Sequence, residues 1–174
     1  MKVIFIVFGV FFLIRLFTLS ISIRNEKRLK RNGAVEFGKK NSILLTLIHV
    51  AYYFSCLYEG YKSEAVFDMY SWVGTGLMTF SYIMLFVVIY QLREIWTVKL
   101  YIAPKHNIVE TSLFKYVRHP NYFLNILPEL IGVAFLCNAW TTLVIGFPLY
   151  CIVLATRIVQ EERAMNSLFA QRIR

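Results

Sequence analysis

Residues 70–92 read YSWVGTGLMTFSYIMLFVVIYQL, a run of twenty-three residues without a charged side chain. One helix needs roughly 20 mostly apolar residues to cross a bilayer core about 30 Å thick. This block is therefore predicted to span a membrane. Working outward from it, we mark four further apolar blocks at about 3–23, 42–59, 122–137 and 140–158.

The composition of the 174 residues agrees with this interpretation. The chain is 58% hydrophobic and 17% charged, whereas soluble domains are about 45–50% apolar and about 25% charged. Its apolar residues come in long blocks and lack the spacing of an amphipathic helix or an alternating strand. We therefore predict an all-α integral membrane protein with five transmembrane helices, and we exclude a soluble globular fold.

The last two apolar blocks are separated only by Asn138 and Ala139. Two residues are too few for a loop between independent spans, so these blocks are predicted to form a tight helical hairpin. Residues 1–92 then make a three-helix membrane region. Residues 93–174 add a polar loop and the hairpin, within a single membrane domain.

The distribution of basic residues predicts how the chain is oriented. Seven Lys and Arg lie in 24–40, five in 93–121 and four from Arg157 onward, whereas the opposite face receives only Lys2 and Lys62. The positive-inside rule then places the N-terminus outside and the C-terminus in the cytoplasm. The formal net charge of +9 is thus a topology signal with some attraction to anionic membrane lipids, and no nucleic-acid partner is expected.

The three cysteines give no sign of a metal centre. Cys56, Cys137 and Cys151 fall in apolar blocks, and their spacings match none of the paired motifs of zinc or redox sites. They are predicted to be small core residues, and no metal is expected.

Polar residues concentrate in the loop before the hairpin. Pro120 has no backbone donor and disfavours helix at the residue before it. Arg118 and His119 are therefore predicted to lie in an extended turn at the mouth of the fourth helix. The N–H groups of a helix start there would suit an anion such as a carboxylate.

A second polar group lies near the end of the last predicted helix. Arg157 and Glu161 are four residues apart, so they share one helix face. Because the fourth and fifth helices form a hairpin, their free ends are neighbours. The hairpin therefore predicts that residues 119–122 lie beside Arg157 and Glu161 and form one pocket with them.

These motifs also carry a family resemblance. The run Arg-His-Pro-Asn-Tyr at 118–122, with His106 twelve residues before it and Arg-x-x-x-Glu-Glu at 157–162, resembles the isoprenylcysteine carboxyl methyltransferase family over about 93–170. The resemblance implies an integral membrane enzyme that methylates a lipophilic acceptor with S-adenosylmethionine and releases S-adenosylhomocysteine. It makes 93–174 the cofactor-binding and catalytic part, with the cofactor near the cytoplasmic face and the lipid tail entering from the bilayer.

The resemblance assigns roles residue by residue, with the acceptor-side arginine falling on Arg157. Two departures occur. A family tyrosine four residues before the Arg-His-Pro run is Phe114 here, which removes a hydroxyl group, and the usual Gly-x-Tyr lead-in is Ser112-Leu113-Phe114. The implied cofactor-binding residues are His106, Asn107, Ile108, Val109, Phe114, Arg118, His119, Pro120, Asn121, Tyr122, Glu161 and Glu162.

The side-chain chemistry suits these roles. Glu161 could hold a cationic amino group or ribose hydroxyls, while Arg118 and His119 suit a carboxylate. Arg157 could hold an acidic acceptor oxygen and keep it ionised. His119 could instead act as a base or as a structural cap. The alternatives for Glu161 and Glu162 are a solvated helix end, and for Arg157 a side chain that reaches the interface.

Glu129 is a further catalytic candidate, because ionisable residues inside a membrane are costly to bury. It shares a helix face with Asn125, four residues earlier. We hypothesise that this face looks into the acceptor cavity and helps to select the polar head group. The alternative is that Glu129 pairs with Arg15 or His49 in the bundle interior.

The acceptor and the reaction leave alternatives open. The acceptor is either a prenylated cysteine carboxylate or a lipid hydroxyl, such as that of a long-chain alkylpyrone; the short chain and the form of residues 157–162 favour the hydroxyl. An NADPH-dependent membrane reductase of the sterol type carries a similar Arg-His-Pro turn, but its Lys-Tyr-Gly motif and Cys-rich tail are missing here. A non-catalytic membrane protein with the same fold is the third possibility.

Overall fold

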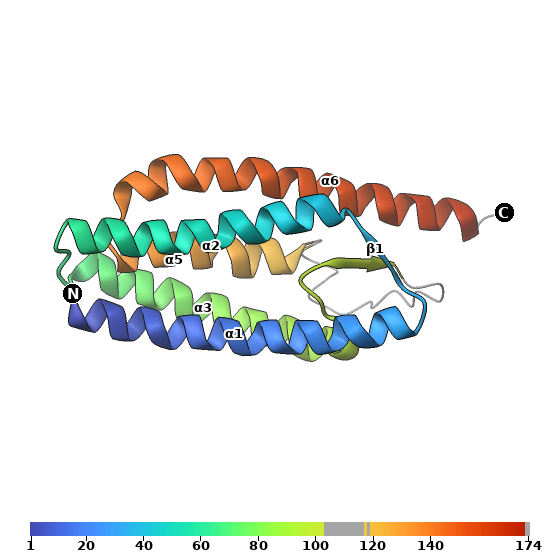
Figure 1. Cartoon of the computed structure of the whole chain (residues 1–174), viewed down its shortest axis with the longest axis horizontal. Helices are drawn as coiled ribbons and strands as arrows, with labels where there is room; N and C mark the ends of the chain where they lie inside the picture. Colours follow the sequence, from blue (N-terminus) through green and yellow to red (C-terminus); the bar gives the residue numbers. More distant parts are fainter. Residues whose placement is uncertain (103–116, 118, 173–174) are drawn as a thin grey trace.

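The structure is a computed structural model that describes residues 1–102, 117 and 119–172, without the side chains of 102 and 165–172. Within these described residues, five α-helices lie side by side in a bundle (Figure 1). Four of them are long and the fifth is shorter. The helices are α1 (Lys2–Arg31), α2 (Lys39–Lys62), α3 (Met69–Leu92), α5 (Leu127–Leu136) and α6 (Phe147–Arg172).

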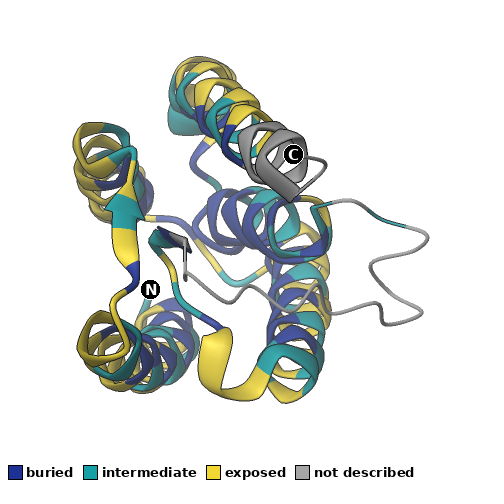
Figure 2. Cartoon of the chain, turned by 90° about the vertical axis from the view of Figure 1, so that its right-hand side faces the viewer, coloured by how far each residue is buried: buried dark blue, intermediate teal, exposed yellow. Residues whose placement is uncertain are grey.

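The chain is an integral membrane protein by the length and composition of its helices. In the part of the chain that the structure describes, four stretches are long and apolar enough to cross a bilayer, and Asn121–Leu136 is a shorter apolar helix. The four are Lys2–Arg31, Lys39–Lys62, Met69–Ile95 and Thr142–Ala164. Residues that are exposed lie mostly on the outward faces of the helices, and buried residues lie mostly on the faces toward the interior (Figure 2). Many of the exposed side chains are large and hydrophobic, as a lipid environment requires. The shorter helix occupies the place of the fourth predicted span.

Glycines allow α3 and α5 to approach closely. A Cβ atom on Gly74 would lie 2.6 Å from the carbonyl oxygen of Gly132, and one on Gly132 would lie 2.9 Å from the carbonyl oxygen of Gly74. Small residues at such crossings let helix backbones meet in membrane proteins. The contact fixes α5 in the interior, where Leu130, Val133 and Leu136 are fully buried.

The predicted hairpin is confirmed. The helix α5 ends at Leu136, a turn follows through Asn138, and helix resumes at Trp140. Asn138 adopts a left-handed conformation with φ of 53°, which asparagine tolerates better than most residues. The N–H group of Ala139 donates to the carbonyl oxygen of Ala134 at 2.8 Å and closes the turn.

Two wide helical segments precede prolines in the hairpin. The π-helical segments η2 (Asn121–Ile126) and η3 (Thr142–Gly146) lie just before Pro128 and Pro148. Each proline lacks the N–H group that would donate to the carbonyl four residues earlier, and the helix widens there. In η2 the Ser81 hydroxyl donates to the carbonyl oxygen of Asn125 at 2.9 Å. The widened turn places Asn121 and Tyr122 at the start of this helix.

A small antiparallel sheet departs from the all-α prediction. The strands β1 (Val35–Phe37) and β2 (Leu100–Ile102) pair with Glu36 opposite Tyr101. The prediction missed them because three-residue strands carry no readable alternation. The hydroxyl group of Tyr101 donates to Glu26 at 2.7 Å and tethers the sheet to α1. A short 3₁₀ turn, η1 (Arg93–Ile95), leads from α3 toward β2.

The two ends of the bundle differ in charge. The sheet and the C-terminal part of α6 lie at one end, which we call the sheet end, and the N-terminus lies at the other (Figure 1). The basic stretch 24–40 belongs to the sheet end, whereas Lys62 belongs to the opposite end. The charge segregation expected for the positive-inside rule is therefore present along the bundle axis.

Candidate active site

The carboxylate of Glu161 joins the two predicted polar segments at the sheet end. It lies on α6, and the Tyr122 hydroxyl group at the start of η2 donates to its Oε1 atom. Its Oε2 atom lies 3.3 Å from Nδ1 of His119. The guanidinium Nε of Arg157, one turn earlier on α6, is 3.3 Å from Oε1. One carboxylate thus holds three groups from two elements.

Arg157 is buried with only 2% of its surface exposed. A buried charge requires partners, and this one has three. Besides Glu161, its Nε donates toward the Tyr122 hydroxyl at 3.4 Å, and its Nη1 donates to the Ser42 hydroxyl of α2 at 2.9 Å. The arginine therefore ties α6 to both η2 and α2, and its position is fixed from three sides.

His119 lies over the ring of Tyr122, with ring centroids 5.8 Å apart and an interplanar angle of 22°. Its Nε2 atom is 3.7 Å from the second glutamate, Glu162. Hydrogen bonding to Glu161 raises the pKa of His119 above its ordinary value of 6.5, although partial burial opposes the shift. The histidine therefore favours its protonated form when Glu161 is its partner.

The start of η2 is less open to an anion than the sequence predicts. The N–H groups of Tyr122 and Phe123 both donate to the carbonyl oxygen of His119, at 3.0 and 3.2 Å. Both N–H groups are thus already hydrogen-bonded within the turn that Pro120 forms. A carboxylate bound here would have to rely on side chains as well as on the helix start.

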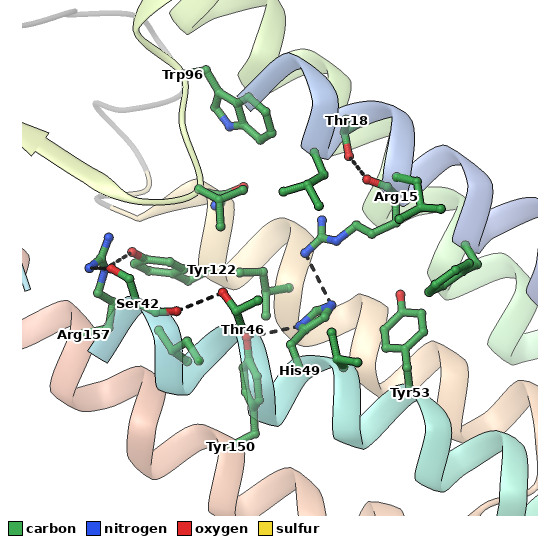
Figure 3. A pocket seen from close by; sticks show the side chains of 18 residues that line it. Arg15, Thr18, Ser42, Thr46, His49, Tyr53, Trp96, Tyr122, Tyr150 and Arg157 are labelled. Atoms are coloured by element: carbon green, nitrogen blue, oxygen red, sulfur yellow. Dashed lines mark hydrogen bonds between the residues drawn. The ribbon is translucent and has the colours of Figure 1, made fainter. Parts of the chain in front are cut away.

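A cavity of about 170 Å³ begins at Tyr122 and Arg157 of this cluster and runs into the bundle. Arg157, Tyr122 and Trp96 lie at one end of it, and Arg15, His49 and Tyr53 lie at the other (Figure 3). Apolar side chains supply most of the wall between the two ends. The cavity is lined by Phe12, Arg15, Leu16, Thr18, Leu19, Ser42, Leu45, Thr46, His49, Val50, Tyr53, Trp96, Val98, Asn121, Tyr122, Ile126, Tyr150 and Arg157.

Glu129 lies behind the far end of the cavity and is not part of its lining, so the hypothesis that it faces the acceptor is corrected. It is fully buried, and its Oε2 atom is 3.4 Å from Nη1 of Arg15. The hydroxyl groups of Tyr53 and Tyr82 donate to its Oε1 atom at 2.5 and 3.0 Å. The structure agrees with the alternative, in which Glu129 pairs inside the bundle, because Arg15 forms an ion pair with this carboxylate and two tyrosines donate hydrogen bonds to it.

Comparison with known proteins identifies a family for this chain. A sequence model described as the isoprenylcysteine carboxyl methyltransferase (ICMT) family matches residues 72–167. The chain belongs to the ICMT family. An uncharacterized protein of Haemophilus influenzae is 52% identical over 94% of this chain and 95% of its own length. The uncharacterized protein YpbQ of Bacillus subtilis is 24% identical over 85% of this chain and 88% of its own length. No solved structure matches the chain.

Membership in the ICMT family implies a membrane methyltransferase, and enzymes of this family in general use S-adenosylmethionine. The matched stretch includes η2, the hairpin, Arg157 and Glu161. It leaves out α1 and α2, which supply the opposite wall of the cavity. The family match therefore covers the wall that η2 and α6 supply, and it gives no information on the wall that α1 and α2 supply.

The structure brings together part of the predicted ICMT site. His119, Tyr122, Arg157, Glu161 and Glu162 form one connected cluster. Asn121 lines the cavity and Pro120 is buried at the turn. The remaining predicted cofactor residues lie outside the described residues: His106, Asn107, Ile108, Val109, Phe114 and Arg118.

Sequence analysis missed three residues of the cavity. Ser42 holds Arg157 from α2 but carries no sequence signal, since a lone serine at a helix start is common. Trp96 follows the end of an apolar block, where tryptophan is common at a membrane boundary, and its indole N–H is buried with no hydrogen-bond partner among the described residues. The Tyr150 hydroxyl lies 3.3 Å from Nδ1 of His49. Only its seven-residue spacing from Arg157 on α6 could have indicated that it faces the cavity.

Proposed function

We propose that this protein transfers a methyl group from S-adenosylmethionine to an oxygen atom of a lipophilic acceptor within the membrane. One observation carries the proposal: Tyr122 and Arg157, which both contact Glu161, also line a largely apolar cavity between the helices. A polar donor and an apolar acceptor can then meet at one place. Ligand sites of this kind combine apolar walls with a few fixed polar groups.

The described residues fit the charged groups of S-adenosylmethionine. Glu161 would hold its cationic amino group or ribose hydroxyls, because a carboxylate is an acceptor for several donors. His119 would hold its carboxylate, since its protonated ring donates from both nitrogens. When bound, the cofactor supplies an electrophilic methyl group on a sulfonium. The pairing between Glu161 and His119 keeps these two opposite charges at fixed positions beside each other.

Arg157 is suited to the acceptor oxygen. Its guanidinium carries five N–H donors, and the contacts to Glu161, Tyr122 and Ser42 involve only Nε and Nη1. The Nη2 atom takes part in none of these three contacts, and the Arg157 side chain lines the cavity. A positive charge at this position stabilises an ionised oxygen and keeps it nucleophilic without a strong base.

The cavity walls supply alignment and exclude water. Holding two reactants in a productive geometry can lower a barrier by roughly 7–11 kcal/mol in favourable cases. The buried guanidinium and the apolar walls are fixed before any ligand arrives, so little reorganisation is needed. The acceptor classes that fit are a prenylated cysteine carboxylate and a long-chain hydroxyl compound such as an alkylpyrone. The cluster is proposed to face the cytoplasm, where the cofactor is available.

Methyl transfer can be measured with purified protein in detergent and S-adenosylmethionine labelled in its methyl group. The two acceptors are N-acetyl-farnesylcysteine and a long-chain alkylpyrone. We expect labelled product from one of them, and at least about a hundredfold less with Arg157→Met. The control is Arg163→Met, an exposed residue on the same helix. If protein that binds the cofactor labels neither acceptor nor membrane lipid, the proposed transfer is wrong.

A further inference from the structure

The far end of the cavity holds a charge pair that the proposed methyl transfer does not use. Arg15 lies midway along α1, and its partner Glu129 is fully buried on α5. Their closest atoms are 3.4 Å apart. A charge deep in a membrane is costly and is a functional candidate by default. Replacing a buried ion pair by apolar residues is often neutral or stabilising, so stability alone gives little reason for this pair.

Arg15 is the exposed member of the pair. Its side chain is 20% exposed, and it lines the cavity, whereas Glu129 lies behind it. Its Nη2 atom lies 3.5 Å from Nε2 of His49. Both contacts are long for hydrogen bonds, and a guanidinium has five N–H donors. Within the described part of the chain, Arg15 therefore keeps donor capacity that faces the cavity.

The charge balance indicates what these donors would bind. Arg15 and Glu129 together are neutral, and tyrosine hydroxyls donate to Glu129. A carboxylate ligand would add an uncompensated negative charge in a low-dielectric region. A neutral carbonyl or hydroxyl oxygen would accept a hydrogen bond from Arg15 without that cost. The site therefore favours a neutral oxygen over an anion.

The helices give the distance between the two polar ends of the cavity. On α2, Ser42 contacts Arg157 at the reacting end and His49 contacts Arg15 at the far end. On α6, Tyr150 contacts His49 and lies seven residues before Arg157. Seven residues correspond to about 10 Å along a helix. Two helices therefore give the same separation.

We propose that Arg15 and His49 bind a neutral carbonyl or hydroxyl oxygen on the lipophilic acceptor, about 10 Å from the oxygen that is methylated. This inference rests on the proposed function for its reacting end. Within either proposed acceptor class, a compound whose chain carries a second polar position at this distance is then bound more tightly than one with a hydrocarbon chain. A chain that is pure hydrocarbon beyond its head group leaves the donors of Arg15 without a partner. Arg15 and His49 are thus specificity-determining residues.

Positional isomers of a keto fatty acid test the inference. An extended alkyl chain spans about 10 Å in about eight carbon–carbon bonds of about 1.5 Å. The probes are octadecanoic acid, 10-oxo-octadecanoic acid and 4-oxo-octadecanoic acid. Trp96 lines the cavity, so a Trp72→Phe/Trp140→Phe background leaves it as the single fluorescent reporter, and each acid is titrated against the protein in detergent.

We expect the 10-oxo acid to bind about tenfold more tightly than the other two acids, as a hydrogen bond to a charged group allows. Arg15→Met/Glu129→Gln should abolish this preference. The matched control, Arg28→Met/Glu94→Gln, removes another Arg–Glu pair that is more exposed and should retain it. Equal binding of the three acids, or a preference that survives in the Arg15/Glu129 variant, overturns the inference.

Two further measurements distinguish a failure of this inference from misfolding of the double variant and from a failure of the proposed function. His49→Phe leaves the Arg15–Glu129 pair intact and should reduce the ketone preference even if the double variant does not fold. A titration with S-adenosylmethionine on the same preparations tests the proposed function by itself. Cofactor binding without a ketone preference refutes only this inference. A ketone preference without cofactor binding refutes only the proposed function, because the fatty acids are titrated in the absence of cofactor.

Discussion

Glu161 is the residue on which the candidate site converges. Its carboxylate contacts Tyr122, His119 and Arg157 at once. Charge-assisted hydrogen bonds from several donors hold such a carboxylate in place. Arg157 in turn is so deeply buried that it depends on the same contact. The site is therefore an interdependent charge cluster, and removing one member changes the others.

Arg157→Met is expected to lower the free energy of unfolding by roughly 2 kcal/mol. The value lies below the range for fully buried pairs because Glu161 retains some exposure. Thermal or denaturant unfolding in detergent measures the change. Arg163→Met, on the exposed face of the same helix, should leave the stability nearly unchanged. Equal stability of the two variants would contradict the role given to the buried guanidinium.

The His119–Glu161 contact predicts a specific pH dependence. Because the pKa of His119 is raised in the folded state, protonated His119 stabilises the fold fully below about pH 6.5, its unfolded value. This contribution is lost as the pH rises through the raised pKa. The unfolding midpoint of His119→Gln should therefore fall below that of the unmodified protein at acidic pH, and the difference should shrink toward alkaline pH. A difference that grows with pH would refute the contact.

The sequence predicts one side of this cluster better than the other. Arg157 and Glu161 are four residues apart on a recognisable helix, and the two-residue hairpin turn implies that residue 119 lies beside them. Ser42 comes from a helix distant in sequence, and only packing in three dimensions reveals its contact. For Glu129 the sequence left two interpretations open, because helix periodicity gives its face but cannot tell a cavity from an interhelical ion pair.

At the scale of elements, the contact of α3 with α5 determines where the site lies. The helix α5 continues directly from η2. The packing of α5 against α3 therefore determines where Tyr122 lies along the axis of the bundle. The widened turn before Pro128 and the close approach at Gly74 both contribute. A change in this contact would move one half of the charge cluster relative to α6.

Two glycines on α3 provide a matched test of that contact. A Cβ atom on Gly74 would overlap the backbone of α5, whereas one on Gly76 would have no neighbour within 4 Å. Gly74→Ala is expected to cost about 1–3 kcal/mol of unfolding free energy through overpacking. Gly76→Ala should be neutral or slightly stabilising, because alanine favours helix. Equal effects of the two substitutions would contradict the close approach.

The elements themselves are predicted well wherever the apolar blocks are long. Hydropathy indicates α1, α2, α3 and α6 because a bilayer requires a minimum length. The short strands β1 and β2 and the π segments were not predicted. Strand pairing depends on a partner that is remote in sequence, and the widened turns depend on local hydrogen bonds that hydropathy does not report.

At the scale of the whole molecule, the walls of the cavity come from two separate parts of the chain. Helices α1 and α2 supply Arg15, Ser42 and His49, and the hairpin supplies Tyr122 and Arg157. The family match covers the hairpin but neither α1 nor α2. We infer that the hairpin carries the shared methyl-transfer chemistry and that the first two helices adapt the cavity to a particular acceptor.

The orientation of the bundle is a prediction from its charges. Lys40 and Lys62 are exposed lysines at opposite ends of α2. In a background without the three native cysteines, a membrane-impermeant maleimide should label Lys62→Cys in intact cells. It should label Lys40→Cys only after the membrane is permeabilised, since the positive-inside rule places the sheet end in the cytoplasm. The reverse pattern of labelling would invert the topology and place the Glu161 cluster outside.

The most direct test of the central claim is isothermal titration of the purified protein with S-adenosylmethionine in detergent. The protein should bind with micromolar affinity, and Glu161→Ala should abolish binding. Glu59→Ala is the matched control, because Glu59 accepts from the backbone of Thr141 and Thr142 at the opposite end of the bundle, and it should bind normally. Absence of binding to folded protein, or undiminished binding to Glu161→Ala, would contradict the assignment of this cluster to the cofactor.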